Sequence, residues 1–210
     1  MKIIKPSFEI LSPVDGPAML KLIEVCGRTC YKSEGKIADG SAESFIRSII
    51  KRGHEAVLEH AHVTIRFICD RGISHEIVRH RLASYCQEST RYCNYSKGAF
   101  GKEITVINPF YLTEGTQEYI RWRESCEEAE RAYTSMLERG CSPQEARAVL
   151  PNSLKTEVVM TANLREWRHF FRLRCAAAAH PQIREVATPA LLELSRRIPV
   201  VFDDIVAEVL

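Results

Sequence analysis

The sequence predicts a mixed α/β (α+β) protein in which helices flank a central β-sheet. In the segment HVTIRFICD, Val63, Ile65, Phe67 and Cys69 alternate with Thr64, Arg66 and Ile68, whereas long segments on either side repeat their apolar residues with the helical period. A chain of 210 residues is long enough to bury a sizeable core, and no internal repeat or low-complexity segment divides it. We therefore expect residues 1–210 to form a single domain.

Seven segments carry the signals of helices. Gly53 and Gly140 end two of them, and SPQE begins another with Ser142 as its cap and Glu145 completing a capping box. Pro189 predicts a kink or break in the last helix. In chain order the expected helices are residues 17–31, 41–52, 72–82, about 116–139, a short helix from Ser142 to Pro151, 163–174 with Asn163 as cap and Glu166 at its third position, and 181–197.

Strands are expected at residues 62–70, 104–107 and 155–162, and KSEGKIADG is expected to be a loop. Because residues 72–82 read as a helix, Arg79, His80 and Arg81 are placed on its last turn, with a loop after them. Consecutive helical side chains splay at about 100° steps, so one small ligand would not meet all three.

Composition and charge exclude several classes of protein. The net charge is only +2, which is less than a nucleic-acid coat or a membrane-surface binder would usually carry. No apolar run approaches the roughly 18 residues of a membrane span, and the start MKIIKPSFEIL has no signal-peptide core, so we expect a cytoplasmic protein. The eight cysteines include no C-x-x-C pair and are expected to be reduced, with Cys26 and Cys30 as buried thiols rather than zinc ligands.

The segment RHRLASYCQESTRY, residues 79–92, concentrates arginines and polar side chains. One interpretation is an oxyanion site, because guanidinium groups pair with phosphate or carboxylate through charge-assisted hydrogen bonds. The alternative is a solvated helix end with surface ion pairs. A second interpretation of Ser89 is a nucleophile with His80 or His75 as base, but G-x-S-x-G is absent and no Asp lies in the segment, so a hydrogen-bonding serine is the better interpretation.

Two other segments carry candidate functional side chains. In GHEAVLEHAH the histidine spacing is not a standard ligand pattern, so we predict no metal, and His54 after Gly53 is expected in a turn that can face a pocket. In NLREWRHFFRLR the arginines at 165, 168 and 172 share helical spacing and, taken alone, read as a solvated stripe.

The spacing of several short motifs along the chain narrows the choice between these interpretations. Arg79-His80-Arg81, seven residues and then Ser89 form R-H-R-x7-S, which resembles the signature of the flavin-dependent thymidylate synthases. The segments GH at 53–54, EARAVLP at 145–151 and NLREWRHFFRLR at 163–174 resemble other blocks of that family, in order. The similarity spans roughly residues 20–200 and is more specific than a lone motif.

The resemblance implies a fold, a reaction and its cofactors. The expected fold is that of the thymidylate synthase-complementing proteins, assembled as a homotetramer with sites shared between subunits. The expected reaction is reductive methylation of dUMP to dTMP, with 5,10-methylenetetrahydrofolate as carbon donor and FAD, reduced by NADPH, as hydride donor. Neither nucleic acid nor a membrane is an expected partner.

The resemblance also implies residue roles. Arg174 would polarise the uracil, and Ser89 would orient it without an enzyme-bound covalent adduct; these two are the expected catalytic residues. The expected dUMP-binding residues are Glu76, Arg79, Gln87, Glu88, Ser89, Arg91, Arg147 and Arg174, and the expected FAD-binding residues are Cys30, His54, Ala56, Arg79, His80, Arg81, Leu82, Gln87, Asn163, Arg165 and His169.

The sequence departs from the family pattern at a few of these positions. Cys30 and Ala56 replace frequent hydroxyl residues, His169 replaces a common amide, and Glu76 stands where glutamine is frequent. His180 is given no role. A module that binds RNA or DNA, and an inactive relative that binds only nucleotide, are the competing hypotheses, and a flavin that NADPH bleaches would exclude both.

Overall fold

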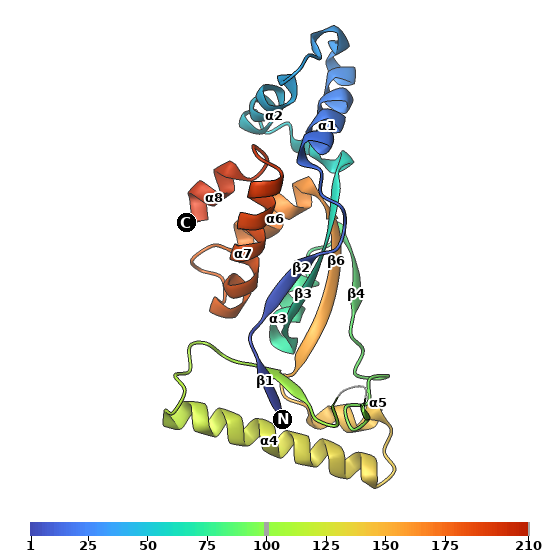
Figure 1. Cartoon of the computed structure of the whole chain (residues 1–210), viewed down its shortest axis with the longest axis vertical. Coiled ribbons are helices and arrows are strands. Elements are labelled where there is room, and N and C mark those ends of the chain that lie inside the picture. The colour runs from blue at the N-terminus through green and yellow to red at the C-terminus, as the bar shows by residue number, and fades with distance from the viewer. Residues whose placement is uncertain (99–100, 210) are drawn as a thin grey trace. The chain divides into compact units, whose positions relative to one another are not determined.

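The computed structural model describes residues 1–98 and 101–209. Its contacts divide the chain into two compact units (Figure 1). The first comprises Met1–Ser7, Phe67–Arg79 and Cys86–Val158, and the second comprises Phe8–Arg66, His80–Tyr85 and Val159–Leu210. That residues 1–210 form one domain stays a prediction.

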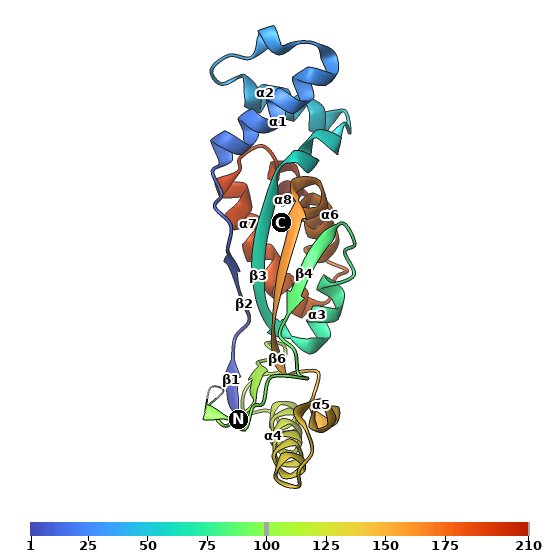
Figure 2. The same ribbon diagram turned by 90° about the vertical axis from the view of Figure 1, so that its right-hand side faces the viewer.

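The strands form two small sheets. In the first, β1 (Lys2–Ile4) runs parallel to β5 (Thr105–Ile107), with Ile3 opposite Val106. In the second, the order is β2 (Ser7–Ile10), β3 (His62–Asp70), β6 (Lys155–Asn163) and β4 (Ala83–Gln87), visible side by side in Figure 2. The mixed α/β class is confirmed, with two sheets where one was predicted.

In the first unit, local signals set the helix boundaries. Asp70 caps α3 (Arg71–Ile77) by accepting a 2.7 Å hydrogen bond from the Ile73 amide, and Thr116 caps α4 (Gln117–Glu138). The predicted capping box begins α5 (Pro143–Ala146), and a 3₁₀ turn, η4 (Arg147–Val149), follows directly. The core includes Tyr95, Ile104, Val106, Cys126, Tyr133, Ala146 and Leu154.

In the second unit, two helices at the amino-terminal end pack closely. They are α1 (Gly16–Tyr31) and α2 (Ser41–Lys51), joined through a 3₁₀ turn, η1 (Glu34–Lys36). A Cβ at Gly27 would lie 2.6 Å from the Phe45 ring, so glycine permits this approach without a shift of the ring. A second 3₁₀ turn, η2 (Glu55–His60), follows α2 and packs against α1.

The remaining helices of the second unit bury its aromatic core. They are α6 (Leu164–Arg174), α7 (Pro181–Arg197) and α8 (Asp203–Val209), which contact one another (Figure 1). Trp167, Phe170, Phe171 and Phe202 stack or meet edge to face there. The α7 helix continues through Pro189, so the predicted break is absent.

Most predicted elements are confirmed, including the alternating burial of β3. Two further predictions are wrong: α3 ends at Ile77, so Arg79, His80 and Arg81 lie beyond the helix, and residues 83–87 form β4 instead of a loop. The reason is non-local, because β4 pairs with β6 and the chain must turn to reach it. Within the two described ranges, no helix is long and apolar enough to cross a membrane.

Candidate functional site

A cationic cavity lies in the first unit beside the start of η4. It has a volume of about 340 Å³, and its walls include Arg71, His75, Thr90, Arg147 and Asn152. The capping box fixes the turn just before Arg147, whose Nη1 donates to the Thr90 hydroxyl at 3.3 Å. Because none of the described residues that line this cavity carries a carboxylate, its charge suits an anion such as phosphate.

The segment 87–91 is held in place around that hydrogen bond. The amide of Gln87 donates to the hydroxyls of Ser74 (2.9 Å) and Thr156 (3.3 Å). Ser89 Oγ accepts from the backbone amide of Arg91 at 3.3 Å. This local hydrogen bond holds the Ser89 hydroxyl, and its expected role of orienting a substrate stays a prediction.

The carboxylate of Glu88 is held by neighbouring side chains of the same unit. Lys155 Nζ lies 3.0 Å from it, and the hydroxyl of Tyr95 donates to it at 3.0 Å. Burial and Glu88 raise the pKa of Tyr95, which keeps that phenol protonated. Of the other predicted nucleotide residues, Glu76 is half-buried on α3, whereas Arg79 and Arg91 are exposed.

In the second unit, His80 forms the centre of a buried polar cluster. Its Nδ1 lies 3.1 Å from a carboxylate oxygen of Glu166, and its Nε2 lies 3.1 Å from Nε of Arg174. The hydroxyl of Tyr85 donates to the His80 carbonyl at 2.7 Å, and the His169 ring meets the His80 ring edge to face at 5.5 Å. Both ring nitrogens are therefore engaged, which argues against His80 as a base for Ser89.

Burial sets the protonation states in this cluster. It lowers the pKa of His80 to about 4, assisted by the charges of Arg174 and His169, so the imidazole is neutral at pH 7. Burial also raises the pKa of Tyr85 to about 12 and raises the pKa of Glu166. Ligand atoms of His80, Glu166 and His169 lie within 4.8 Å of one another, but hydrogen bonds and the Arg174 cation already satisfy His80.

The predicted flavin residues of the second unit fall on two groups of elements. His54 follows α2, and its Nδ1 lies 3.0 Å from the Tyr31 hydroxyl. It borders a cavity of about 410 Å³ whose other polar walls are cationic or hydroxylic: Arg28, Ser33, Lys36, Ser44, Ser48 and Arg52. Cys30, on the last turn of α1, is exposed, so its predicted burial is wrong; its thiol points back to the Cys26 carbonyl. Ala56 is exposed on η2.

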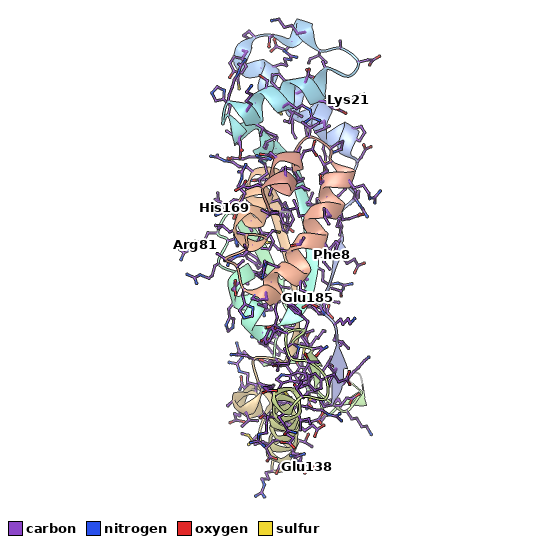
Figure 3. All side chains as sticks on the ribbon, turned by 90° about the vertical axis from the view of Figure 1, so that its left-hand side faces the viewer. Phe8, Lys21, Arg81, Glu138, His169 and Glu185 are labelled. Carbon is purple, nitrogen blue, oxygen red and sulfur yellow. The ribbon has the colours of Figure 1, made fainter. Side chains whose placement is uncertain are left out.

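The second group lies on α6 and on the turn before β4. Asn163 accepts from the Glu166 amide at 2.9 Å and so caps α6, while Arg165 pairs with Glu59 at 2.7 Å. Arg81 extends away from the ribbon, and His169 is exposed on α6 (Figure 3). Leu82 is 70% exposed, an apolar surface available to a ligand.

Comparison with known proteins identifies the family. Residues 14–200 match the family model described as thymidylate synthase complementing protein. The chain belongs to this family. The flavin-dependent thymidylate synthase of Pyrococcus furiosus is 34% identical over 186 residues, covering 88% of this chain and 75% of the relative. That of Geobacter sulfurreducens is 33% identical over 189 residues, covering 87% and 80%. The resemblance stated from the sequence is confirmed.

A solved structure matches this member of the thymidylate synthase complementing protein family over nearly its whole length. It is the UMP/dUMP methylase PolB from Streptomyces cacaoi bound with 5-Br dUMP, with a TM-score of 0.79 and 25% identity. The match covers 99% of this chain and 97% of that one. The mixed α/β fold is therefore shared with that enzyme.

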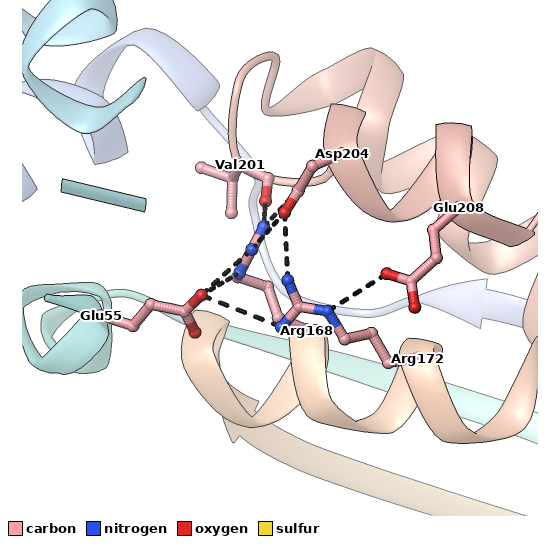
Figure 4. A network of polar contacts seen from close by, with 6 residues as sticks. All are labelled: Glu55, Arg168, Arg172, Val201, Asp204 and Glu208. Atoms are coloured by element: carbon pink, nitrogen blue, oxygen red, sulfur yellow. Dashed lines mark hydrogen bonds and ion pairs between the residues drawn. The ribbon is translucent and has the colours of Figure 1, made fainter. Parts of the chain in front are cut away.

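Sequence patterns misassigned one arginine of this family member. Arg168 is 0% exposed rather than part of a solvated stripe. Its guanidinium meets Asp204 at 2.6 and 2.7 Å, Glu55 at 3.1 Å and the Val201 carbonyl (Figure 4). Arg172 joins the same network through Asp204 at 3.0 Å. These contacts tie η2 and α8 to α6 and have a structural role.

Sequence reasoning missed four functional or structural partners. Glu166 had been assigned only as a helix-start residue, and Lys155, Thr90 and Arg71 had no assigned role. The position of Glu166 two turns before Arg174 on one helix was the available signal. His180, which also lacked a role, caps α7 by accepting from the Gln182 amide at 3.3 Å.

Proposed function

We propose that this protein is a flavin-dependent thymidylate synthase that converts dUMP to dTMP. The observation that carries the proposal is the family match over residues 14–200, which includes every predicted site residue from Cys30 to Arg174. Relatives that cover most of the chain bear this name, and a structural neighbour is described as a UMP/dUMP methylase bound with a nucleotide analogue.

The cavity of the first unit supports a nucleotide monophosphate as ligand. Arg147 and Thr90, which are 57 residues apart, share a hydrogen bond there. Ser89 and Arg91 flank Thr90 in the chain. We infer that Arg147 and Arg91 bind the phosphate, with Arg79, Gln87 and Ser89 around the nucleoside; Glu76 and Glu88 complete the proposed set. Each charge-assisted bond would contribute about 1.5–3 kcal/mol.

The cluster in the second unit supports a polarising role for Arg174. Its Nε is engaged by His80, so the guanidinium has a fixed direction. A fixed cation beside uracil favours negative charge that develops at N3 and O2 when C5 forms its new carbon–carbon bond. Ser89 would orient the nucleotide by hydrogen bonding, with no covalent adduct to the enzyme.

The residues present fit a flavin dinucleotide. The cavity beside His54 is walled by cations and hydroxyls, which suits phosphates, and exposed Leu82 offers an apolar surface near Arg81 in the chain. His54, Cys30, Ala56, Arg79, His80, Arg81, Leu82, Gln87, Asn163, Arg165 and His169 would hold it. When bound, FAD reduced by NADPH would supply the hydride that completes the methyl group, and 5,10-methylenetetrahydrofolate would supply the carbon. We further propose a homotetramer with sites shared between subunits.

The experiment is an assay of purified protein with dUMP labelled with tritium at C5. We expect bound FAD that NADPH bleaches, and tritium release together with dTMP only when methylenetetrahydrofolate and NADPH are both present. UMP in place of dUMP tests whether the ribonucleotide is accepted. Colourless protein that FAD cannot reconstitute, or NADPH oxidation without any methylated nucleotide, would overturn the proposal.

A further inference from the structure

We propose that Glu166 is a positioning residue: through the imidazole of His80 it fixes the direction in which the guanidinium of Arg174 points. The inference rests on the proposed function, because the role of Arg174 beside uracil comes from it. Glu166 was not among the predicted site residues.

Hydrogen-bond donors and acceptors in the cluster determine the tautomer of His80. The Nε of Arg174 can only donate, because a guanidinium has no acceptor. His80 Nε2, 3.1 Å away, must therefore be the unprotonated nitrogen. A neutral imidazole then carries its proton on Nδ1, and this N–H donates to the Glu166 carboxylate at 3.1 Å. The carboxylate thus selects the one tautomer that can accept from Arg174.

Burial of the cluster strengthens the preference of His80 for this tautomer. His80 is 4% exposed and Glu166 is 7% exposed, so little water is available to replace either partner. A protonated His80 would present N–H groups on both sides, and one of them would face the N–H of Arg174. Burial and the Arg174 charge disfavour that form by lowering the pKa of His80. An unpaired Nδ1–H in this place would cost a full desolvation penalty.

The surroundings hold the three side chains in one arrangement. Asn163 caps α6 and so fixes the turn that carries Glu166, and Arg174 is the last residue of the same helix. Tyr85 holds the His80 backbone carbonyl at 2.7 Å, and the Phe170 ring packs edge to face on the imidazole at 4.9 Å. His80 therefore bridges the first and last turns of α6 from a separate chain segment.

The test compares Glu166→Gln and Glu166→Leu with wild type, using Glu193→Gln as the matched control. Glu193 lies on α7 of the same unit and pairs with Arg196 and Arg197 at the surface, so its variant should leave turnover unchanged. Glu166→Leu should lower kcat about 10- to 100-fold, the cost seen when a hydrogen-bond partner that orients a metal ligand is removed, with KM for dUMP and flavin reduction by NADPH little changed. Glu166→Gln keeps an accepting oxygen and should lose less.

A second measurement needs no ligand and no activity. In protein labelled with nitrogen-15 histidine, and with His80→Asn to assign the signals, wild-type His80 at pH 7 should be neutral with its proton on Nδ1. Glu166→Leu should shift the ring toward the Nε2-protonated form.

Either of two results would overturn the proposal: a wild-type His80 protonated on Nε2, or Glu166 variants that lose thermal stability and flavin while kcat per bound flavin stays at the wild-type value. If Glu166→Leu does not fold, the Glu166→Gln kinetics and the wild-type tautomer decide. A wild-type protein that binds flavin but does not methylate dUMP would contradict the proposed function. The tautomer measurement would still decide whether Glu166, His80 and Arg174 are hydrogen-bonded as proposed.

Discussion

The cavity around Arg147 and the cluster around His80 use polar side chains in opposite ways. In the cavity of the first unit, Arg71 and Arg147 line an open space, and no carboxylate is found among the described residues of its walls. In the second unit, His80, Glu166 and Arg174 pair with one another, and Arg168 pairs with Glu55 and Asp204. Open cations are available to a ligand, whereas paired and buried groups fix geometry. Substitutions in the cavity should therefore weaken ligand binding, whereas substitutions among the paired groups should lower turnover or stability.

The largest effect is expected at Arg174, which belongs to the paired cluster but is proposed to act on substrate. Arg174→Ala should lower tritium release from C5-labelled dUMP by about 10²- to 10³-fold, the usual cost of one preorganised electrostatic group. The fold should persist, as circular dichroism would check. Turnover near the wild-type rate would remove Arg174 from its proposed role and make the cluster purely structural.

A loss of stability is expected at Arg168. Arg168→Ala should lower the free energy of unfolding by about 3–5 kcal/mol, because it leaves Glu55 and Asp204 without their buried partner. Urea denaturation measures the change. Arg172→Ala, at a partly exposed member of the same network, should cost about 1 kcal/mol or less. Equal costs at both positions would contradict the distinction between buried and exposed pairs.

A binding defect is expected in the open cavity. Arg147→Ala should raise KM for dUMP about tenfold or more, since one charge-assisted bond to phosphate is worth about 1.5–3 kcal/mol. The unfolding free energy should stay within about 0.5 kcal/mol of wild type, because the residue is exposed. Deoxyuridine, which lacks the phosphate, should bind both proteins equally. If Arg147→Ala prefers dUMP over deoxyuridine by the same ratio as the wild type, then Arg147 does not bind the phosphate.

The smallest effect is a pH dependence of stability from His80. Its pKa in the folded protein is about 4, below the ordinary value of 6.5, so the unfolded chain binds the proton more readily. Its contribution is complete above pH 6.5 and is lost as the pH falls toward 4. Glu166, Tyr85, His169 and Arg174 face this ring. Melting curves of wild type and His80→Gln should converge across that window; parallel curves would mean that His80 does not titrate there.

Local signals in the sequence predicted much of the fold. The alternation in β3 and the caps at Ser142 and Asn163 are properties of neighbouring residues, and each is where it was expected. The end of α3 was wrong because pairing of β4 with β6 decides it, and those strands are far apart in the chain.

The same reason explains the errors in the candidate site. Arg168 looked solvated because its partners Glu55 and Asp204 lie 113 and 36 residues away. Glu166 looked like half of a capping box, but its carboxylate turns to His80, 86 residues away. The segment 79–92 was recognised because its characteristic residues lie close together in the chain. The side chains that orient it come from distant segments, so the sequence did not reveal them.

The close approach of α1 and α2 at Gly27 has a consequence for protein engineering. A Cβ at position 27 would meet the Phe45 ring at 2.6 Å, so a library that varies position 27 alone should recover mostly glycine, and any larger residue would require the ring to shift. Varying positions 27 and 45 together should recover paired solutions, such as alanine at the first with leucine at the second, because the added methyl group then occupies the volume that the ring gives up.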